Sequence, residues 1–186
     1  MDLGTDRVNV YDRAMRALPA CSFSTAPAGA GPRHLAFHPN GKFAFVVFEL
    51  GNLVTGYRFG DGRFAPVQQL PLLPEGYADF SKAAAIKFSP DGRQLFCSNR
   101  GHDSLAVFDV DSGTGYLTPR GIVKLGGAYP RDFGFLPDGK TLVACLKMSG
   151  VVRTYRYDAA ACSLVPLDEI DGLHRPLYFG LGAALG

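Results

Sequence analysis

A four-residue turn sequence recurs three times in this chain and constrains its fold more than any other feature. The turn reads Pro39-Asn40-Gly41-Lys42, then Pro-Asp-Gly-Arg from Pro90, then Pro-Asp-Gly-Lys from Pro137. The separations are 51 and 47 residues (90 − 39 and 137 − 90). In the first copy, apolar runs at 35–38 and 43–50 flank the turn, where Pro fixes φ and Asn-Gly accommodates a positive φ. Each copy therefore predicts a β-hairpin within an internal repeat.

The repeat extends beyond the hairpin. Eighteen residues after each turn proline an aromatic residue ends another strand, at Tyr57, Phe108 and Tyr155, and a polar turn then leads into a fourth short strand. Four strands per repeat of about 40 to 50 residues is typical of a β-propeller blade. The 14 Phe, 8 Tyr, 23 Gly and 13 Pro suit sheets joined by tight turns. The helix-like stretch 80–86 is expected to be loop leading into strand, so we predict an all-β propeller of four-stranded antiparallel blades.

The repeat register divides the chain, which we treat as one domain spanning 1–186. Residues 2–10 align with 99–107, so the chain is expected to begin at the end of a blade's second strand. Because a propeller ring closes with about four to eight blades, we expect a truncated piece of a larger protein, or else self-association or a partner fragment that completes the ring. A complete four-bladed ring is the least favoured alternative. The predicted parts are the end of a truncated blade at 1–30, complete blades at 31–79, 80–125 and 126–172, and the opening strand of a further blade at 173–186.

Composition and charge exclude several classes of partner. The net charge is only +2, without the basic runs that bind phosphate backbones, so nucleic acid is not expected. No stretch approaches the roughly 18 apolar residues of a membrane span, and the acidic N-terminus does not resemble a signal peptide. The four cysteines share no Cys-x-x-Cys spacing and no histidine pair has metal-ligand spacing, so we expect no metal, other cofactor or disulfide. The cytoplasm is the expected location.

Charged residues occur at equivalent positions in successive blades. Glu49, Arg100 and Lys147 lie ten residues after the turn prolines, where the second strand ends, and repeat geometry places them on one rim. Arg33 and Arg131 lie six residues before the turns, at the entry to the innermost strand. An acid among arginines could act as a general base beside an anion-binding group, because guanidinium pairs with carboxylate or phosphate. The alternatives are solvated loop charges and, for Arg33 and Arg131, an inter-blade ion pair, for example with Asp132.

The histidines are less informative. Strand alternation places His34 on the face opposite Arg33, which favours a structural role, and His38 and His174 are also interpreted as structural. His102 lies on a loop expected to face the channel and is a candidate substrate contact. Asp6 and Asp103 share a turn position where aspartate commonly bonds backbone amides, so both are interpreted as structural. A Gly-x-Ser-x-Gly serine hydrolase elbow is absent.

Three segments together resemble the lactonase family of seven-bladed propellers, which includes bacterial 6-phosphogluconolactonases and fungal carboxymuconate-lactonizing enzymes. They are GPRHLAFHPNGKFAFVVFEL, SPDGRQLFCSNRGHDSLAVFDVD and YPRDFGFLPDGKTLVAC. The resemblance covers essentially the whole chain and corresponds to about the C-terminal half of a family member. It implies a lactone-handling site in the central channel, lined by loops that follow second strands and precede first ones.

The chain also departs from the family pattern. Phe48 stands where the family usually has Asn, and Leu146-Lys147 stands where it usually has Asn-Gln. The family's proposed catalytic histidine lies in the N-terminal half and has no counterpart here. Within the SNRGHDS motif, Asn99 joins His102 as a predicted substrate contact.

The leading hypothesis is hydrolysis of an anionic sugar lactone such as 6-phosphogluconolactone. Glu49 would act as acid/base, while Arg33 and Arg100 hold the acyl oxygen or the anionic tail; Arg131, Lys147, Asn99 and His102 would bind substrate. A second hypothesis is a non-catalytic propeller binding module or remnant, because propellers serve as platforms as readily as enzymes. A third is lactonizing cycloisomerase activity on a muconate.

Overall fold

A computed structural model describes residues 1–25 and 27–181 of the chain. Every regular element in this part is a β-strand, which confirms the all-β prediction. The stretch 80–86 leads into strand β7, as predicted. The strands are β1 (Arg7–Val8), β2 (Phe23–Ser24), β3 (Pro32–Phe37), β4 (Phe43–Phe48), β5 (Leu53–Gly60), β6 (Arg63–Pro71), β7 (Lys82–Phe88), β8 (Gln94–Arg100), β9 (Ser104–Val110), β10 (Leu117–Lys124), β11 (Pro130–Phe135), β12 (Thr141–Leu146), β13 (Val151–Asp158) and β14 (Ser163–Ile170).

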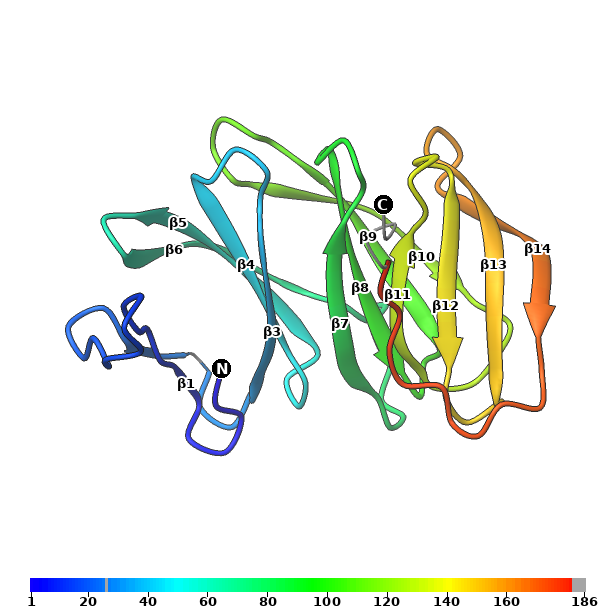
Figure 1. Cartoon of the computed structure of the whole chain (residues 1–186), viewed down its shortest axis with the longest axis horizontal. Coiled ribbons are helices and arrows are strands. Elements are labelled where there is room, and N and C mark those ends of the chain that lie inside the picture. The colour runs from blue at the N-terminus through cyan, green and yellow to red at the C-terminus, as the bar shows by residue number, and fades with distance from the viewer. Residues whose placement is uncertain (26, 182–186) are drawn as a thin grey trace.

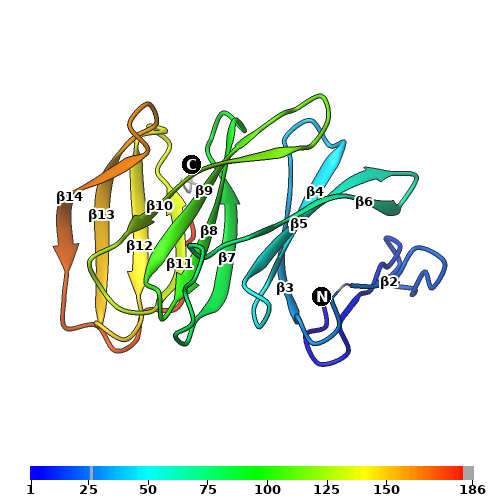
Figure 2. The same ribbon diagram turned by 180° about the vertical axis from the view of Figure 1, so that it is seen from behind.

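Strands β3 to β14 form three four-stranded antiparallel sheets. Their orders are β3-β4-β5-β6, β10-β9-β8-β7 and β11-β12-β13-β14, so each sheet is a meander. This is the arrangement of a propeller blade and confirms the predicted blade type. The three sheets follow one another across Figure 1, and Figure 2 shows them from behind. Strand β7 contacts both β3 and β11, so the first strands of the three blades meet along one edge.

The repeated turns form the hairpins that the sequence predicts. The glycines Gly41, Gly92 and Gly139 have φ values of 71°, 73° and 68°, a region in which a Cβ atom would be strained. The residue before each glycine also fixes the turn, because its side-chain oxygen accepts a hydrogen bond from the backbone N–H two residues later. These bonds are Lys42 to Asn40 at 2.9 Å, Arg93 to Asp91 at 3.1 Å and Lys140 to Asp138 at 2.9 Å.

Strand β8 shows how the core forms between blades. All seven of its residues are buried, and successive side chains point to opposite faces of the sheet. Leu95 and Cys97 pack toward the first blade in a cluster with Phe45 of β4. Phe96 packs toward the third blade against Phe133 of β11. The middle blade is therefore an inner layer with a hydrophobic neighbour on each face.

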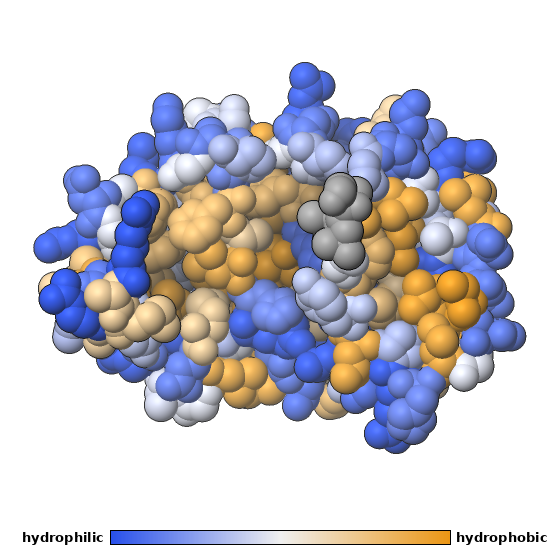
Figure 3. Space-filling view, viewed as in Figure 1, coloured by the Kyte–Doolittle hydropathy of each residue, from blue (hydrophilic) through white to orange (hydrophobic). Residues whose placement is uncertain are grey.

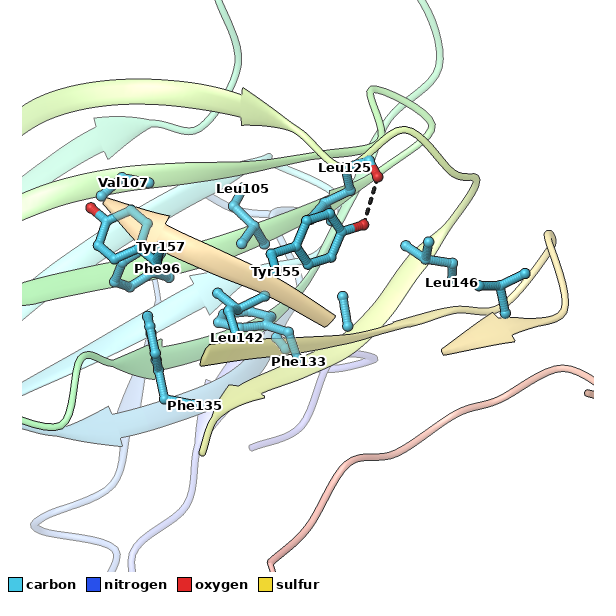
Figure 4. Packing of buried hydrophobic residues seen from close by; sticks show 13 residues of the cluster. Phe96, Leu105, Val107, Leu125, Phe133, Phe135, Leu142, Leu146, Tyr155 and Tyr157 are labelled. Carbon is cyan, nitrogen blue, oxygen red and sulfur yellow. Dashed lines mark hydrogen bonds between the residues drawn. The ribbon is translucent and has the colours of Figure 1, made fainter. Parts of the chain in front are cut away.

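Aromatic side chains pack among aliphatic ones in the cluster between the second and third blades, shown in Figure 4. The ring centroid of Phe96 lies 5.2 Å from that of Phe135 and 5.1 Å from that of Tyr157. The hydroxyl of Tyr155 donates a hydrogen bond of 2.6 Å to the carbonyl oxygen of Leu125. The repeated aromatics Tyr57, Phe108 and Tyr155 are all buried, and strands β5, β9 and β13 run two or three residues beyond them rather than ending there.

Equivalent turn residues join each unit to the next. The residues at this position, Asp6, Asn52 and Asp103, have positive φ values of 52°, 48° and 55°. The Gly31 N–H donates to Asp6 Oδ1 at 2.8 Å, and the Tyr129 N–H donates to Asp103 Oδ1 at 2.7 Å; each donor precedes a Pro-Arg pair. The Asn52 side-chain amide donates to the Ser81 carbonyl at 3.0 Å. The structural interpretation of Asp6 and Asp103 is confirmed.

The chain ends differ from the complete blades. Strands β1 and β2 form a short antiparallel pair that precedes the first blade. The segment 171–181 contains no strand, whereas the sequence predicted an opening strand within 173–186, of which 182–186 lie outside the described residues. A strand requires hydrogen bonds between its backbone and that of a neighbouring strand. This segment lies beside β11 (Figure 1), and the backbone of Phe179 bonds to side chains there. There Phe179 N–H donates to Asp132 Oδ2 at 3.0 Å, and Lys87 Nζ donates to the Phe179 carbonyl at 3.4 Å.

The face of the molecule seen in Figure 1 has an apolar centre bordered by hydrophilic side chains, as Figure 3 shows. Within residues 1–25 and 27–181, no helix is long and apolar enough to cross a membrane.

Candidate functional site

A carboxylate between two guanidinium groups lies where the first and second blades meet. Glu49, just beyond β4, accepts contacts at Oε2 from Arg33 Nε of β3 and from Arg100 Nη2 at the end of β8, both at 3.0 Å. The Arg100 side chain is only 3% exposed and that of Arg33 11%, while Glu49 keeps 16%. The structure thus brings together the three residues that the sequence predicts as catalytic.

Backbone carbonyl groups of β7 hold both arginines in place. Arg33 Nη1 donates to the Ala84 carbonyl at 2.7 Å, and Arg100 donates to Ala83 at 2.7 Å from Nη2 and to Lys82 at 3.2 Å from Nε. The β7–β8 register shifts between Ala83 and Ile86, and this bulge interrupts the ladder at Ala84. A bulged residue is left unpaired, so its carbonyl can accept a side-chain donor.

The site places a carboxylate directly beside two guanidinium groups. The shortest contacts from Arg33 and Arg100 to Glu49 both end on Oε2. The β7 carbonyl groups are bound by Nη1 of Arg33 and by Nε and Nη2 of Arg100. Such a site can accept a proton at the carboxylate and donate hydrogen bonds from guanidinium nitrogens. These are the two functions that acyl transfer to water requires.

The site carries more positive than negative charge. Burial lowers the pKa of Arg33, and repulsion from Arg131 and then Arg100 lowers it further, so Arg131 lies close enough to act on Arg33. Among the described residues, Arg131 and Lys147 form no ion pair with a carboxylate. The excess charge favours an anionic ligand.

The alternative ion pair between Arg131 and Asp132 is not formed. Asp132 Oδ1 instead lies 3.1 Å from Lys87 Nζ of β7, so this carboxylate joins the second blade to the third. Asp132 is buried, and its other oxygen accepts the Phe179 N–H bond. The sequence could not show this pairing because it depends on how two blades face each other.

Asn99 and His102, which the sequence predicts as substrate contacts, instead make hydrogen bonds in and around the β8–β9 loop. Asn99 is fully buried and donates to the Leu72 carbonyl at 2.8 Å and to Ser104 Oγ at 3.3 Å. His102 is also buried, with Nδ1 2.7 Å from Ser104 Oγ and its ring centroid 4.7 Å from that of Tyr77. Neither residue hydrogen-bonds to Glu49, so in this structure both shape the loop.

Sequence reasoning missed Tyr129, which precedes β11. Its ring centroid lies 5.2 Å from Arg100 Cζ and 5.5 Å from Lys147 Nζ. Lys147 is thus connected to Arg100 through an aromatic ring. The only signal in the sequence is position, because Tyr129 precedes the Pro-Arg pair just as Gly31 does in the first blade.

His34 was predicted on the wrong face. Its ring nitrogens lie 3.0 Å and 3.2 Å from Arg33 Nη1, so the imidazole belongs to the same polar cluster. The β3–β4 register shifts between Pro32 and His34, and a bulge breaks the alternation on which the prediction relied. His34 is exposed at the surface, but its ring is partly shielded from water by the surrounding protein. This shielding, followed by repulsion from Arg33, lowers the pKa of His34 from 6.5 to about 4. Solvent contact reduces the resulting effect on stability.

This shift predicts a pH dependence of stability. Between pH 6.5 and about 4 the unfolded chain binds a proton at His34 that the folded chain does not bind. The His34 contribution to the free energy of unfolding is therefore complete above pH 6.5, falls as the pH drops toward 4, and is constant below. Urea unfolding across this range should show a shallower pH slope for His34→Gln than for the unmutated chain. His174→Gln, in the exposed C-terminal segment, should keep the original slope, and equal slopes in all three would contradict the assignment.

Comparison with known proteins gives consistent matches. Residues 1–178 match the family model described as "Lactonase, 7-bladed beta-propeller". A 6-phosphogluconolactonase of Bacillus subtilis is 37% identical over 179 residues, covering 95% of this chain and 51% of that protein. The chain thus spans about half the length of this relative.

Solved structures agree with the sequence match. The periplasmic gluconolactonase of Pseudomonas aeruginosa has a TM-score of 0.87 and 33% identity, covering 95% of this chain and 51% of that one. A Lactobacillus plantarum protein has a TM-score of 0.86 and 31% identity, with 95% and 52% covered. With its four-stranded blades and a family match over nearly its whole length, this chain belongs to the lactonase family of seven-bladed β-propellers.

Proposed function

We propose that this chain acts as a lactonase on an anionic sugar lactone such as 6-phosphogluconolactone. The observation that carries the proposal is the Glu49 carboxylate held at Oε2 by Arg33 and Arg100, with 16% of the Glu49 side chain still exposed. Relatives named 6-phosphogluconolactonase and gluconolactonase support the reaction class. The cytoplasmic location remains a prediction.

In the proposed reaction, Glu49 Oε1 takes a proton from a water molecule as the water oxygen attacks the lactone carbonyl carbon. The carbonyl oxygen becomes negative, and a guanidinium nitrogen of Arg33 or Arg100 donates a hydrogen bond to it. The ring C–O bond then breaks, and the leaving oxygen receives the proton from Glu49. The products are a ring-opened hydroxy acid and a carboxylate restored for the next cycle.

The two arginines divide this work unequally. Arg100 is almost fully covered and donates to two β7 carbonyl groups, so its main contribution is to orient Glu49. Arg33 makes one carbonyl bond and retains more exposure, which suits it to meet the substrate oxygen. The arginines fix the position of the Glu49 carboxylate, and its effect as a base depends on that positioning.

The anionic tail of the substrate would bind Arg131 and Lys147, which form no ion pair with a carboxylate in the described part of the chain. A phosphate or carboxylate accepts strong charge-assisted hydrogen bonds from such groups. Asn99 and His102 would contribute indirectly, because their hydrogen bonds to Ser104 hold the conformation of the β8–β9 loop.

The substrate class can be tested by comparing three lactones. Purified chain should hydrolyse 6-phosphogluconolactone with a higher kcat/KM than uncharged gluconolactone or a muconolactone. Lys147→Gln should reduce the preference for the phosphorylated lactone about tenfold, the effect of one lost charged contact. Lys140→Gln is the matched control, because Lys140 precedes β12 whereas Lys147 follows it, at the opposite end of the same strand.

The outcomes separate the competing functions. Equal rates with phosphorylated and uncharged lactones would contradict the anionic substrate. Faster turnover of muconolactone would favour the lactonizing alternative. Saturable binding of 6-phosphogluconolactone without turnover would favour a binding module.

A further inference from the structure

Tyr129 has a backbone conformation that a tyrosine adopts only under constraint. Its φ is 66°, in the left-handed region where a Cβ atom crowds the backbone. The equivalent residue of the first blade is Gly31, with a φ of 68°. Since glycine adopts this conformation at lower cost, the tyrosine side chain needs an explanation other than the turn itself.

Two hydrogen bonds hold this backbone. The Tyr129 N–H donates to Asp103 Oδ1 at 2.7 Å, and the Tyr129 carbonyl accepts the Lys147 N–H at 3.0 Å. Both bonds use main-chain atoms of Tyr129, so any residue in this conformation could form them. The blade junction therefore does not depend on the aromatic ring.

The ring instead contacts the site. Arg100 Cζ lies 5.2 Å and Lys147 Nζ 5.5 Å from its centroid, both within the range of cation–π attraction. Arg100 is 3% exposed, so its attraction to the ring and to Glu49 acts largely out of water. Two cations that would otherwise repel each other share one electron-rich ring.

We infer that Tyr129 is a positioning residue that holds the Arg100 guanidinium against Glu49. The ring fixes Arg100 while β7 carbonyl groups bind its Nε and Nη2 atoms. Backbone strain kept at a site where glycine would suffice is a sign of such a functional constraint. The effect on Arg100 geometry is independent of the reaction, whereas the kinetic effect rests on the proposed lactonase function.

The test compares Tyr129→Phe, which keeps the aromatic face, with Tyr129→Leu, which keeps the Cβ atom and apolar bulk but loses that face. Nuclear magnetic resonance would follow the Arg100 Nε–Hε signal, which its hydrogen bond to Lys82 protects from exchange. The signal is assigned by its loss in Arg100→Lys. Exchange of this Nε–Hε proton with water should be equally slow in the unmutated chain and the Phe variant, and faster in the Leu variant. With 6-phosphogluconolactone, kcat should fall about tenfold in the Leu variant only, with KM changed by less than about twofold.

Tyr129→Gly provides a second test if the Leu variant does not fold. It copies the Gly31 backbone, so it should fold at least as well as the unmutated chain, while its Arg100 Nε–Hε proton exchanges faster with water. Unchanged exchange in the Leu or Gly variant would overturn the inference whatever the activity. Faster exchange in a Leu variant whose kcat equals that of an active unmutated chain would also overturn it. Absence of turnover in every protein would instead count against the lactonase function, and the resonance data would still decide the role of Tyr129.

Discussion

Replacing Glu49 by glutamine should lower the free energy of unfolding by about 3 kcal/mol, the lower end of the cost of breaking a buried ion pair. The substitution leaves Arg33 and Arg100 with 11% and 3% exposed side chains and no carboxylate between them. Glu49 itself keeps 16% exposure, which places the effect at that lower end. Urea denaturation at neutral pH measures the change.

The same substitution at Glu169 is the control. Glu169 Oε2 lies 2.7 Å from Arg153 Nη2, but the Glu169 side chain is 47% exposed. An exposed ion pair contributes less than about 1 kcal/mol. Similar losses in Glu49→Gln and Glu169→Gln would mean that the Glu49 cluster behaves as an ordinary surface ion pair, against the arrangement described here.

Gly101→Ala should be among the most destabilising single-methyl additions, with a loss above about 3 kcal/mol. Gly101 follows Arg100 and has a φ of 105°. An added Cβ atom would overlap the carbonyl oxygen of Phe80, which belongs to the backbone and cannot rotate away. The clash lies beside the site, so the alanine variant should also displace Arg100. Thermal and urea denaturation measure the loss.

Gly41→Ala separates conformational strain from the clash. Gly41 has a φ of 71° in a hairpin turn, and an added Cβ atom would have nothing within 4 Å. Only the left-handed backbone is then penalised, at about 1 to 2 kcal/mol. If Gly101→Ala were no more destabilising than Gly41→Ala, the Phe80 carbonyl would have to move aside easily, which would contradict the predicted clash.

The sequence was sufficient to predict the blades because its signals are local and repeated. Turn glycines, the residues before them and period-two apolar runs each specify a hairpin without reference to distant contacts. The repeat register also placed Glu49 and Arg100 at equivalent strand ends, and their meeting follows from blades packed side by side. Arg33 meets Glu49 within the first blade, because β3 pairs with β4 and Pro32 lies opposite Phe48.

The sequence could not predict features that depend on backbone irregularity or on pairing between blades. The bulge before His34 moves the imidazole to the face of Arg33, and the bulge in β7 frees the carbonyl of Ala84 to bind Arg33. Neither bulge has a distinctive residue pattern. The strained conformation of Tyr129 is likewise visible only in the backbone angles.

Hydrolysis of 6-phosphogluconolactone by the unmutated chain, Glu49→Gln and Glu169→Gln tests the central claim most directly. All three should be folded at the assay temperature, as checked by circular dichroism. The unmutated chain and Glu169→Gln should exceed the spontaneous rate, whereas Glu49→Gln should lose about a hundredfold or more, the usual contribution of a general base. A rate for the unmutated chain no higher than the spontaneous one, or full activity in Glu49→Gln, would contradict the account.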